Sequence, residues 1–370
     1  MTDVQPDRAG SHRRVNSPGG QLHVGDWAGP EPAFVMMHGF PDDSAIYQRL
    51  VPLLTPNRVI TFDWLGYGRS GRPGNTAEQA PRHQGELEAV LDTLELGRVV
   101  LVAHDASGPD AIDFTLAHPG RVAHLILLNT YYGHAAPLQF PEMIRLFADA
   151  NLGPLLDAML EDNNQRLWLL GHTARRFGGD PLDPQGVGLT CVFPQFFGGD
   201  DHPDALAAIR AWTRRLFPAL DQQDAHIRQG QLARLTLPVT LIFGAADSYL
   251  SPQLAADLAD LFGHATVHLV TDASHWPQWD QPAAVAKLIK AATAEPGCGV
   301  LDAGQADRTP ARGRPTRMFC ALQLVRQQKL AAASIRRSGR TAVQAYPTPR
   351  DFSWSWFTRA EPPYGRQLHR

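Results

Sequence analysis

The chain has few cysteines and no long apolar run. Only three of its 370 residues are cysteine, and their spacing matches no disulfide framework or metal motif. This scarcity favours a reducing compartment, so we expect a cytoplasmic protein. The first residues lack the apolar core of a signal peptide, and no segment approaches the roughly 18 apolar residues of a membrane span. We therefore expect no membrane partner.

Positive charge is scarce in most of the chain and concentrated at its end. The net charge is −3, but residues 296–370 hold 13 lysines and arginines against 4 acidic residues. Residues 1–295 are therefore acidic, which argues against nucleic acid as the main partner. The Pro-, Arg- and Gly-rich composition of residues 296–370 predicts a disordered basic tail. A tail that binds nucleic acid or a membrane surface is the alternative. Residues 1–17 are also expected to be disordered.

Short apolar runs recur between turn signals. They are too continuous for half-exposed strands and suit a parallel sheet that is covered on both faces. Helical patterns separate several of them, so the sequence predicts a doubly wound, mostly parallel α/β sheet built from residues 18–130 and 237–295. The runs are 34–39, 58–64, 98–105, 123–129, 238–244 and 265–270.

The strand–helix alternation stops between residues 131 and 236. This stretch contains helical patterns at 141–151, 152–177 and 203–217, joined by Gly-, Pro- and Asp-rich segments. The sheet pattern resumes at residue 238. We therefore interpret residues 131–236 as a helical cap inserted into the sheet domain.

The segment VAHDASGPDAIDF, residues 102–114, reads as a buried strand, a tight turn and the start of a helix. Asp105 lies at the turn, and the small residues Ala103 and Ser107 allow the chain to reverse sharply there. A helix cap is the ordinary role of an aspartate at such a place. A nucleophile presented at the edge of the sheet is the functional alternative.

Three further segments resemble the α/β-hydrolase superfamily. HGFP (38–41) follows an early strand, GAADSYLSP (244–252) carries Asp247, and ASHWPQWDQP (273–282) carries His275. DWLGYGRSGRP (63–73) is typical of a further loop of these folds. Asp247 and His275 also have ordinary readings, as a turn residue and a loop histidine. Together with Asp105 they follow the order nucleophile, acid, histidine, each at a strand's C-terminal edge, where open α/β sheets bind ligands.

The resemblance implies an α/β-hydrolase fold from its aspartate-nucleophile branch, which includes haloalkane dehalogenases and epoxide hydrolases. An ionised aspartate can attack a saturated carbon that carries a leaving group, forming an ester. His275 would activate the water that hydrolyses this ester, and Asp247 would orient the imidazole. The N–H groups of Phe40 and Ala106 would form the oxyanion hole. We expect a small apolar organic substrate, with no cofactor and no metal.

The sequence departs from this branch around the leaving group. Ala106 replaces the tryptophan that many of these enzymes place after the nucleophile, and no tyrosine occurs between residues 133 and 248. Candidate contacts to a leaving group or substrate are Trp212, Trp168, Tyr131 and His38. For both tryptophans, packing in the core is the alternative.

These observations favour hydrolysis of a carbon–halogen bond, with epoxide hydrolysis as the alternative. The missing tyrosines count against epoxides, because an opening ring needs a proton. The further alternative is a binding protein that retains the fold without catalysis. The sequence does not give the substrate size or the oligomeric state.

Overall fold

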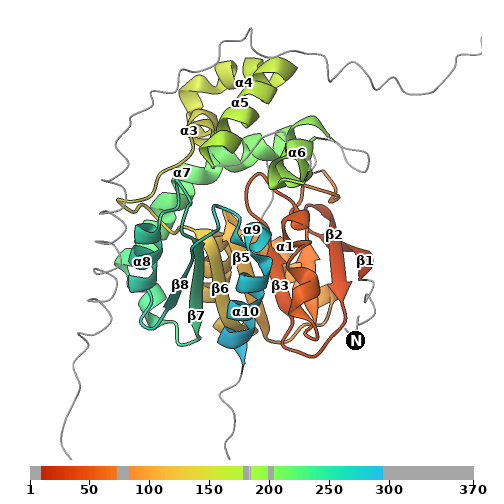
Figure 1. The fold of residues 1–370 in the computed structure, drawn as a ribbon, viewed down its shortest axis with the longest axis vertical. Helices are drawn as coiled ribbons and strands as arrows, with labels where there is room; N and C mark the ends of the chain where they lie inside the picture. The colour runs from red at the N-terminus through yellow and green to blue at the C-terminus, as the bar shows by residue number, and fades with distance from the viewer. Residues whose placement is uncertain (1–9, 73–82, 178–182, 184, 199–203, 295–370) are drawn as a thin grey trace, which may run out of the picture. The chain divides into compact units, whose positions relative to one another are not determined.

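The computed structural model describes residues 10–72, 83–177, 183, 185–198 and 204–294. Its centre is a sheet with strand order β1-β2-β4-β3-β5-β6-β7-β8 (Figure 1). The strands are β1 (Ser11–Ser17), β2 (Gly20–Trp27), β3 (Phe34–Met37), β4 (Val59–Phe62), β5 (Val99–Asp105), β6 (Val122–Thr130), β7 (Val239–Gly244) and β8 (Thr266–Val270).

The six apolar runs form the six strands β3 to β8. Neighbouring strands in this group pair in parallel, with Met37 opposite Ala103 and Ala103 opposite Leu127 near the carboxyl ends. β3, β4 and β7 are buried along their whole length, as expected for a sheet covered on both faces. The prediction of a doubly wound, mostly parallel α/β sheet is confirmed.

The prediction of disorder for residues 1–17 is wrong for residues 11–17. They form β1, which pairs antiparallel with β2, and β2 pairs antiparallel with β4. β1 lies at the edge of the sheet, and only Val15 in it is buried. An edge strand with one buried side chain needs no apolar run, because the backbone ladder holds it in place.

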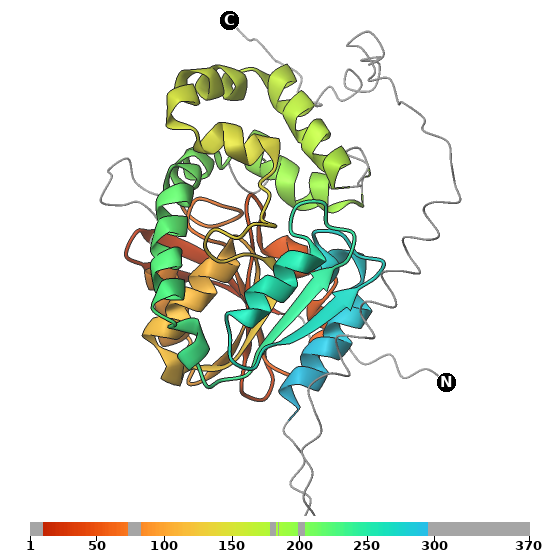
Figure 2. The same ribbon diagram turned by 90° about the vertical axis from the view of Figure 1, so that its left-hand side faces the viewer.

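Helices cover both faces of the sheet. The apolar side chains of α1, α2 and α8 pack in one core cluster, and those of α9 and α10 pack in a second cluster on the other face. Figure 2 shows α8 and α10 flanking the sheet in the turned view. The bounds are α1 (His83–Thr93), α2 (Ser107–Ala117), α8 (Pro252–Asp260), α9 (Pro277–Asp280) and α10 (Pro282–Thr293).

A group of helices lies above the end of the sheet where the parallel strands finish (Figure 1). The expected helix at 152–177 is divided at Asp162, whose side chain accepts hydrogen bonds from the first N–H groups of the next helix. The helix expected at 203–217 extends to Arg228. The cap helices are α3 (Glu142–Ala148), α4 (Gly153–Glu161), α5 (Asn163–Arg176), α6 (Phe193–Phe197) and α7 (Leu206–Arg228).

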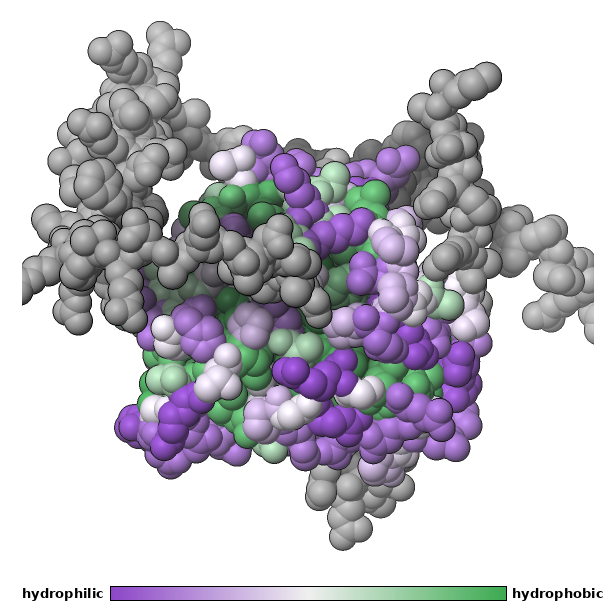
Figure 3. All heavy atoms as spheres, turned by 90° about the horizontal axis from the view of Figure 1, so that it is seen from below, coloured by the Kyte–Doolittle hydropathy of each residue, from purple (hydrophilic) through white to green (hydrophobic). Residues whose placement is uncertain are grey.

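The basic tail, residues 296–370, lies outside the described residues. Within the described part of the chain, no helix combines the length and the apolar character needed to cross a membrane. Figure 3 views the molecule from below, away from the cap, where hydrophilic (purple) and hydrophobic (green) residues are interspersed.

Candidate active site

Asp105 occupies a sharp turn between β5 and α2. Its φ of 50° lies in the left-handed region, which aspartate tolerates better than most residues. Ser107 Oγ lies 2.8 Å from the carbonyl oxygens of both His104 and Met37, which share its single proton, and Thr130 Oγ1 donates to the carbonyl of Asp105 at 2.5 Å. These bonds fix the turn against β3 and β6, and the carboxylate is presented at the edge of the sheet.

The turn after β3 supplies the first contact to this carboxylate. The Phe40 N–H donates to Asp105 Oδ2 at 3.0 Å. A Cβ atom at Gly39 would lie 2.6 Å from the Asp105 Cβ, so only glycine allows this approach. The N–H of Phe40 is therefore directed at the Asp105 carboxylate, which is the geometry expected of the predicted oxyanion-hole donor.

His38 shapes this turn. Its Nδ1 donates to the Gly39 carbonyl at 2.9 Å, and its Nε2 accepts from the Trp64 N–H at 3.0 Å. Burial lowers the pKa of His38, which agrees with the neutral ring that this bonding requires. Both nitrogens are engaged with the main chain, so His38 holds this turn in place. Its side chain also lines the small cavity next to Ala106, and its contact with a substrate stays a prediction.

His275 and Asp247 meet beside Asp105. His275 Nδ1 donates to Asp247 Oδ2 at 2.8 Å, and His275 Nε2 lies 3.9 Å from Asp105 Oδ1. Asp247 Oδ1 accepts from the N–H groups of Tyr249 and Leu250 at 2.9 and 3.1 Å. The structure thus brings together the three residues that the sequence placed far apart, with the imidazole between the two carboxylates.

Asn129 is part of this arrangement and was missed by the sequence reasoning. Its Nδ2 donates to Asp247 Oδ2 at 2.8 Å, and its Oδ1 accepts from the Gly244 N–H at 2.7 Å. It joins the end of β6 to β7 and holds Asp247 toward His275. A polar residue at the end of the apolar run LILLN was the available signal, because a buried amide needs partners.

A second buried imidazole supports the loop of His275 from behind. His104 Nε2 donates to the carbonyl oxygen of His275 at 2.8 Å, and His104 Nδ1 lies 3.5 Å from Asp42 Oδ2. The same Asp42 oxygen accepts from Trp276 Nε1 at 3.2 Å. The carbonyl group of His275 and the side chain of the following residue, Trp276, are therefore both held in place.

The three ionisable groups influence one another's charge. Burial alone would lower the pKa of His275, but the charges of Asp247 and Asp105 and the bond to Asp247 raise it to about 9. Burial would raise the pKa of Asp247, yet its pairing with His275 and its backbone bonds hold it below the ordinary value. Burial raises the pKa of Asp105 above its ordinary value, against the opposing charge of His275. His275 is therefore a cation at neutral pH while Asp105 is ionised.

A small cavity adjoins the proposed oxyanion hole. Ala106, Gly39 and Phe40 line it, and Trp212 of the cap helix α7 closes it, stacked on the Phe40 ring with centroids 4.0 Å apart. Trp212 is thus beside the turn after β3 that contacts Asp105, whereas the Tyr132 hydroxyl bonds to Asp113 and His226.

Tyr131 is buried near Asp105. Burial raises its pKa, and the charges of Asp105 and Asp110 raise it further. Trp168 is different. It lies on α5 with 60% of its surface exposed and stacks on His172. Neither the predicted contact nor the core position holds for Trp168, because this face of α5 is turned toward solvent.

The sequence reasoning also missed a second carboxylate–imidazole pair. His83 begins α1, and its Nδ1 lies 2.7 Å from Asp110 Oδ2 in the first turn of α2. Both residues line the small cavity next to Ala106. His83 begins a polar segment, and an acidic residue such as Asp110 is common in the first turn of a helix, so no sequence pattern distinguishes either residue.

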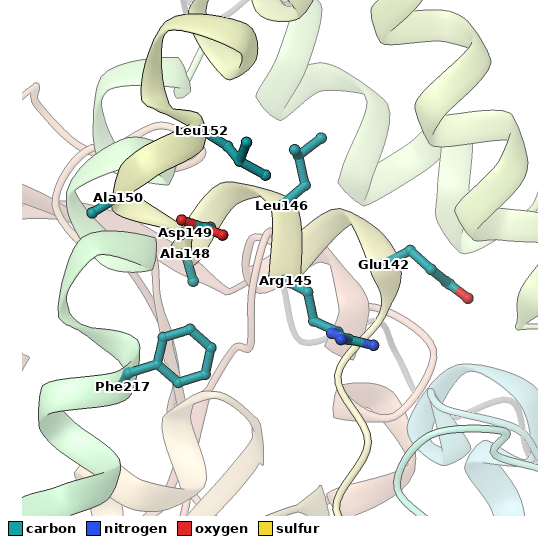
Figure 4. A pocket seen from close by; sticks show the side chains of 8 residues that line it. All are labelled: Glu142, Arg145, Leu146, Ala148, Asp149, Ala150, Leu152 and Phe217. Atoms are coloured by element: carbon teal, nitrogen blue, oxygen red, sulfur yellow. The ribbon is translucent and has the colours of Figure 1, made fainter.

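The cap covers the histidine. The Phe177 ring, at the end of α5, packs against His275 with ring centroids 4.7 Å apart and against Trp276 at 5.1 Å. A larger hollow lies within the cap, formed by α3, residues 148–152 and Phe217 of α7 (Figure 4). It includes none of the residues around Asp105. Among the described residues, no group of three His, Cys, Asp or Glu side chains is arranged to hold a metal ion.

Sequence comparisons agree with this geometry. A family described as "alpha/beta hydrolase fold" matches residues 32–282. The chain is 27% identical to the AB hydrolase superfamily protein YfhM of Bacillus subtilis, over 74% of this chain and 95% of that protein. It is 24% identical to haloalkane dehalogenase 2 of Mycobacterium bovis (75% and 93% covered). It is 23% identical to bifunctional epoxide hydrolase 2 of Sus scrofa (74% and 53% covered).

Solved structures share the fold. Cfl2 of Burkholderia cenocepacia aligns with a TM-score of 0.63 at 22% identity, covering 78% of this chain and 97% of that one. The haloalkane dehalogenase DbeA of Bradyrhizobium elkani aligns with a TM-score of 0.59 at 22% identity, covering 76% and 98%. The family match spans most of the sheet domain and the cap. The chain therefore belongs to the alpha/beta hydrolase fold family.

Proposed function

We propose that this α/β-fold hydrolase acts through an ester formed on Asp105, and that its substrate carries a carbon–halogen bond. The observation that supports this most is the geometry of the nucleophile: Oδ2 accepts from the Phe40 N–H at 3.0 Å while Oδ1 lies 3.9 Å from His275 Nε2. A carboxylate already ionised next to an imidazolium needs no base before it attacks.

In the first step, Asp105 Oδ1 attacks the carbon that bears the halogen. The new C–O bond forms as the carbon–halogen bond breaks, and the halide leaves with the electron pair. Attack on an ester or amide carbonyl would instead give an anhydride, which is much higher in energy. A carboxylate nucleophile therefore favours a saturated carbon as the target.

In the second step, water hydrolyses the ester. Once Asp105 is esterified, His275 has lost one of the two negative charges that raise its pKa, so it gives up its proton more easily. The neutral imidazole takes a proton from water, and hydroxide adds to the ester carbonyl carbon. The Phe40 and Ala106 N–H groups stabilise the resulting oxyanion. Collapse of this intermediate breaks the bond between Asp105 Cγ and Oδ1, and the departing oxygen takes the proton that His275 accepted from water, which gives the alcohol. The new carboxyl group of Asp105 then gives its proton to His275 and becomes a carboxylate again.

The test separates the two steps. His275→Gln leaves Asp105 able to attack but removes the base, so we expect the ester to accumulate. After exposure to a panel of haloalkanes, haloacids and epoxides, mass spectrometry should find added mass on the peptide that contains Asp105. Asp105→Asn in the same background is the matched control and should show none.

An adduct on another residue, or no adduct from a substrate that the wild-type protein converts, contradicts the proposed chemistry. A wild-type protein that converts no member of the panel and forms no adduct favours the alternative of a binding protein without catalysis.

Epoxide hydrolysis is the second candidate, for one specific reason. Epoxide opening needs a group that gives a proton to the leaving oxygen, and the cap helices have no tyrosine for this. The small cavity beside Ala106 is lined by an imidazole–carboxylate pair, His83 and Asp110, which is a group that can carry a proton.

A further inference from the structure

The two edges of the sheet differ in how they are protected against pairing with another chain. β1 forms one edge and carries two adjacent arginines, Arg13 and Arg14, and charged side chains of this kind commonly prevent such pairing. β8 forms the other edge (Figure 1) with the sequence TVHLV, which contains no Lys, Arg, Asp, Glu or Pro. Its apolar side chains Val267 and Leu269 are 36% and 42% exposed. β8 therefore has the composition of a strand that is paired on both sides.

The backbone of β8 presents two residues on its outer side. The Ala245 N–H, just after β7, donates to the Val270 carbonyl at 2.9 Å, so the backbone groups of Val270 face β7. Because these groups point to alternate sides along a parallel strand, His268 also faces β7, while Val267 and Leu269 face outward. Among the described residues, no further strand pairs with this outer side. The N–H and C=O groups of two residues are therefore available to another chain.

We propose that β8 is the interface of a symmetric dimer, in which the β8 strands of two copies pair antiparallel about a two-fold axis at His268. In this arrangement Val267 lies opposite Leu269 of the partner subunit, and each such pair exchanges both of its backbone hydrogen bonds. His268 lies opposite the partner's His268. The axis thus pairs every outward N–H and C=O group of the strand and joins the two sheets into one continuous sheet.

The side chains match under the same symmetry. Directly opposite residues of an antiparallel pair have their side chains on one face, so Val267 and Leu269 of both copies form a single apolar cluster. His264 precedes β8 and Asp272 follows it, and both are exposed. The axis brings His264 opposite Asp272 of the partner subunit, so a basic side chain meets an acidic one at each end of the paired strands. This match of β8 with itself favours a second copy of the chain as the occupant over an unrelated strand.

Sedimentation velocity of the full-length protein over a range of concentrations measures the association. We expect an equilibrium between monomer and dimer. Leu269→Lys should raise the dissociation constant by at least about 100-fold, because a symmetric dimer places the new charge in the apolar cluster twice. Leu155→Lys, at a leucine of α4 that is 51% exposed, is the matched control and should leave the constant within about threefold.

Disulfide cross-linking tests the position of the axis. The background carries Cys298→Ser and Cys320→Ser, which leaves only the buried Cys191. In it, His268→Cys should form a disulfide-linked dimer under mild oxidation, because the two cysteines lie directly opposite with their Cβ atoms about 4.5–5.5 Å apart. Val267→Cys should form none, because its counterpart lies diagonally across at about 7–8 Å, which is too far for a disulfide bond.

A protein that stays monomeric at every concentration overturns the proposal, and so does a dimer that Leu269→Lys leaves intact or that Leu155→Lys weakens equally. Cross-linking through Val267→Cys but not through His268→Cys overturns the proposed axis. Assemblies larger than a dimer contradict it too, because a closed pairing of this edge stops at two copies. If Leu269→Lys does not fold, as judged by circular dichroism, the two cysteine variants decide. None of these outcomes depends on the proposed ester chemistry.

Discussion

The two oxygens of Asp105 have different neighbours. Oδ2 is held by a backbone N–H, and Oδ1 faces an imidazolium at a distance longer than a hydrogen bond. In the proposed reaction, the bonded oxygen carries the negative charge of the second step, and the other oxygen attacks the substrate. This difference gives the carboxylate a defined orientation before any substrate arrives.

The pH dependence of the two steps follows from these groups. Ester formation needs ionised Asp105, so its rate should fall as the pH falls through the pKa of Asp105, which burial raises above the ordinary value. Ester hydrolysis needs neutral His275. Its rate should rise with pH and level off below pH 9, because the pKa of about 9 includes the charge that Asp105 loses in the ester. Rapid-quench single-turnover measurements resolve both steps.

Asp247→Asn provides the control for this assignment. It removes the charge that contributes most to the raised pKa of His275, so the midpoint of ester hydrolysis should move to lower pH. Hydrolysis that is independent of pH from about pH 5 to about pH 9 would show that another group is the base.

Trp212 provides a test of halide stabilisation. Its indole stacks on Phe40 and lines the cavity beside Ala106. Trp212→Phe keeps an aromatic ring but removes the N–H, so halide release in a single turnover should slow by the equivalent of roughly 1–3 kcal/mol. Trp168→Phe, on the exposed face of α5, is the matched control and should change nothing. Unchanged halide release in Trp212→Phe would assign the indole to packing alone.

Among individual residues, the sequence identified those that lie in a recognisable turn after a strand. It did not identify residues whose position depends on a partner far away along the chain. Asp105, Asp247 and His275 each follow an apolar run, so their common edge was predictable. The pairing of His83 with Asp110 depends on how α1 and α2 lie against each other, which no local pattern records. Trp168 was misassigned because an aromatic residue in a helical pattern does not reveal which side of the helix is covered.

Among the elements, α6 connects the cap to the sheet domain through one side chain. Gln195 is fully buried; its Nε2 donates to Asp43 Oδ2 at 2.9 Å, and its Oε1 accepts from the Gly68 N–H at 3.1 Å. Asp43 follows the HGFP turn, and Gly68 belongs to the loop after β4. The position of the cap over the site is therefore tied to the loop that carries Phe40.

Gln195→Leu should weaken this connection. The substitution leaves the Gly68 N–H and the Asp43 carboxylate without their partner in a buried place, which costs roughly 1–3 kcal/mol for each unpaired group. We expect the free energy of unfolding, measured with urea, to fall by about 2–4 kcal/mol. Gln222→Leu, on an exposed position of α7, should leave it nearly unchanged. Equal stability of the two variants would show that the cap is held by its apolar contacts.

The elements differ in how well the sequence revealed them. Apolar runs with turn signals at both ends predicted β3 to β8, and for the buried strands of this group few other compositions are available. β8 lies at the edge of the sheet and is mostly exposed, so its apolar run did not indicate burial. β1 was missed because its side chains are mostly exposed and polar. The division between α4 and α5 was missed because Asp162 is compatible with both a helix interior and a helix cap, and tertiary packing decides between them.

For the whole molecule, the site draws on residues from Gly39 to His275, all of which precede the basic tail. Removal of residues 297–370 should therefore leave both folding and turnover intact. Circular dichroism, thermal unfolding and the single-turnover assay of the truncated protein check this. A truncated protein that is insoluble or inactive would show that the tail packs on the sheet domain or completes the site.

The hydrogen bond from the Phe40 N–H to Asp105 Oδ2 determines which oxygen atom of this side chain is exchanged during the proposed reaction. In the proposed reaction, the oxygen that attacks departs with the product alcohol, and an oxygen from water replaces it. The oxygen held by Phe40 stays. In each turnover, one carboxylate oxygen of Asp105 thus leaves in the product alcohol, and an oxygen atom from water takes its place in the side chain. Run in heavy-oxygen water, the first product released from each molecule carries light oxygen, and the isotope enters the protein before it reaches any product.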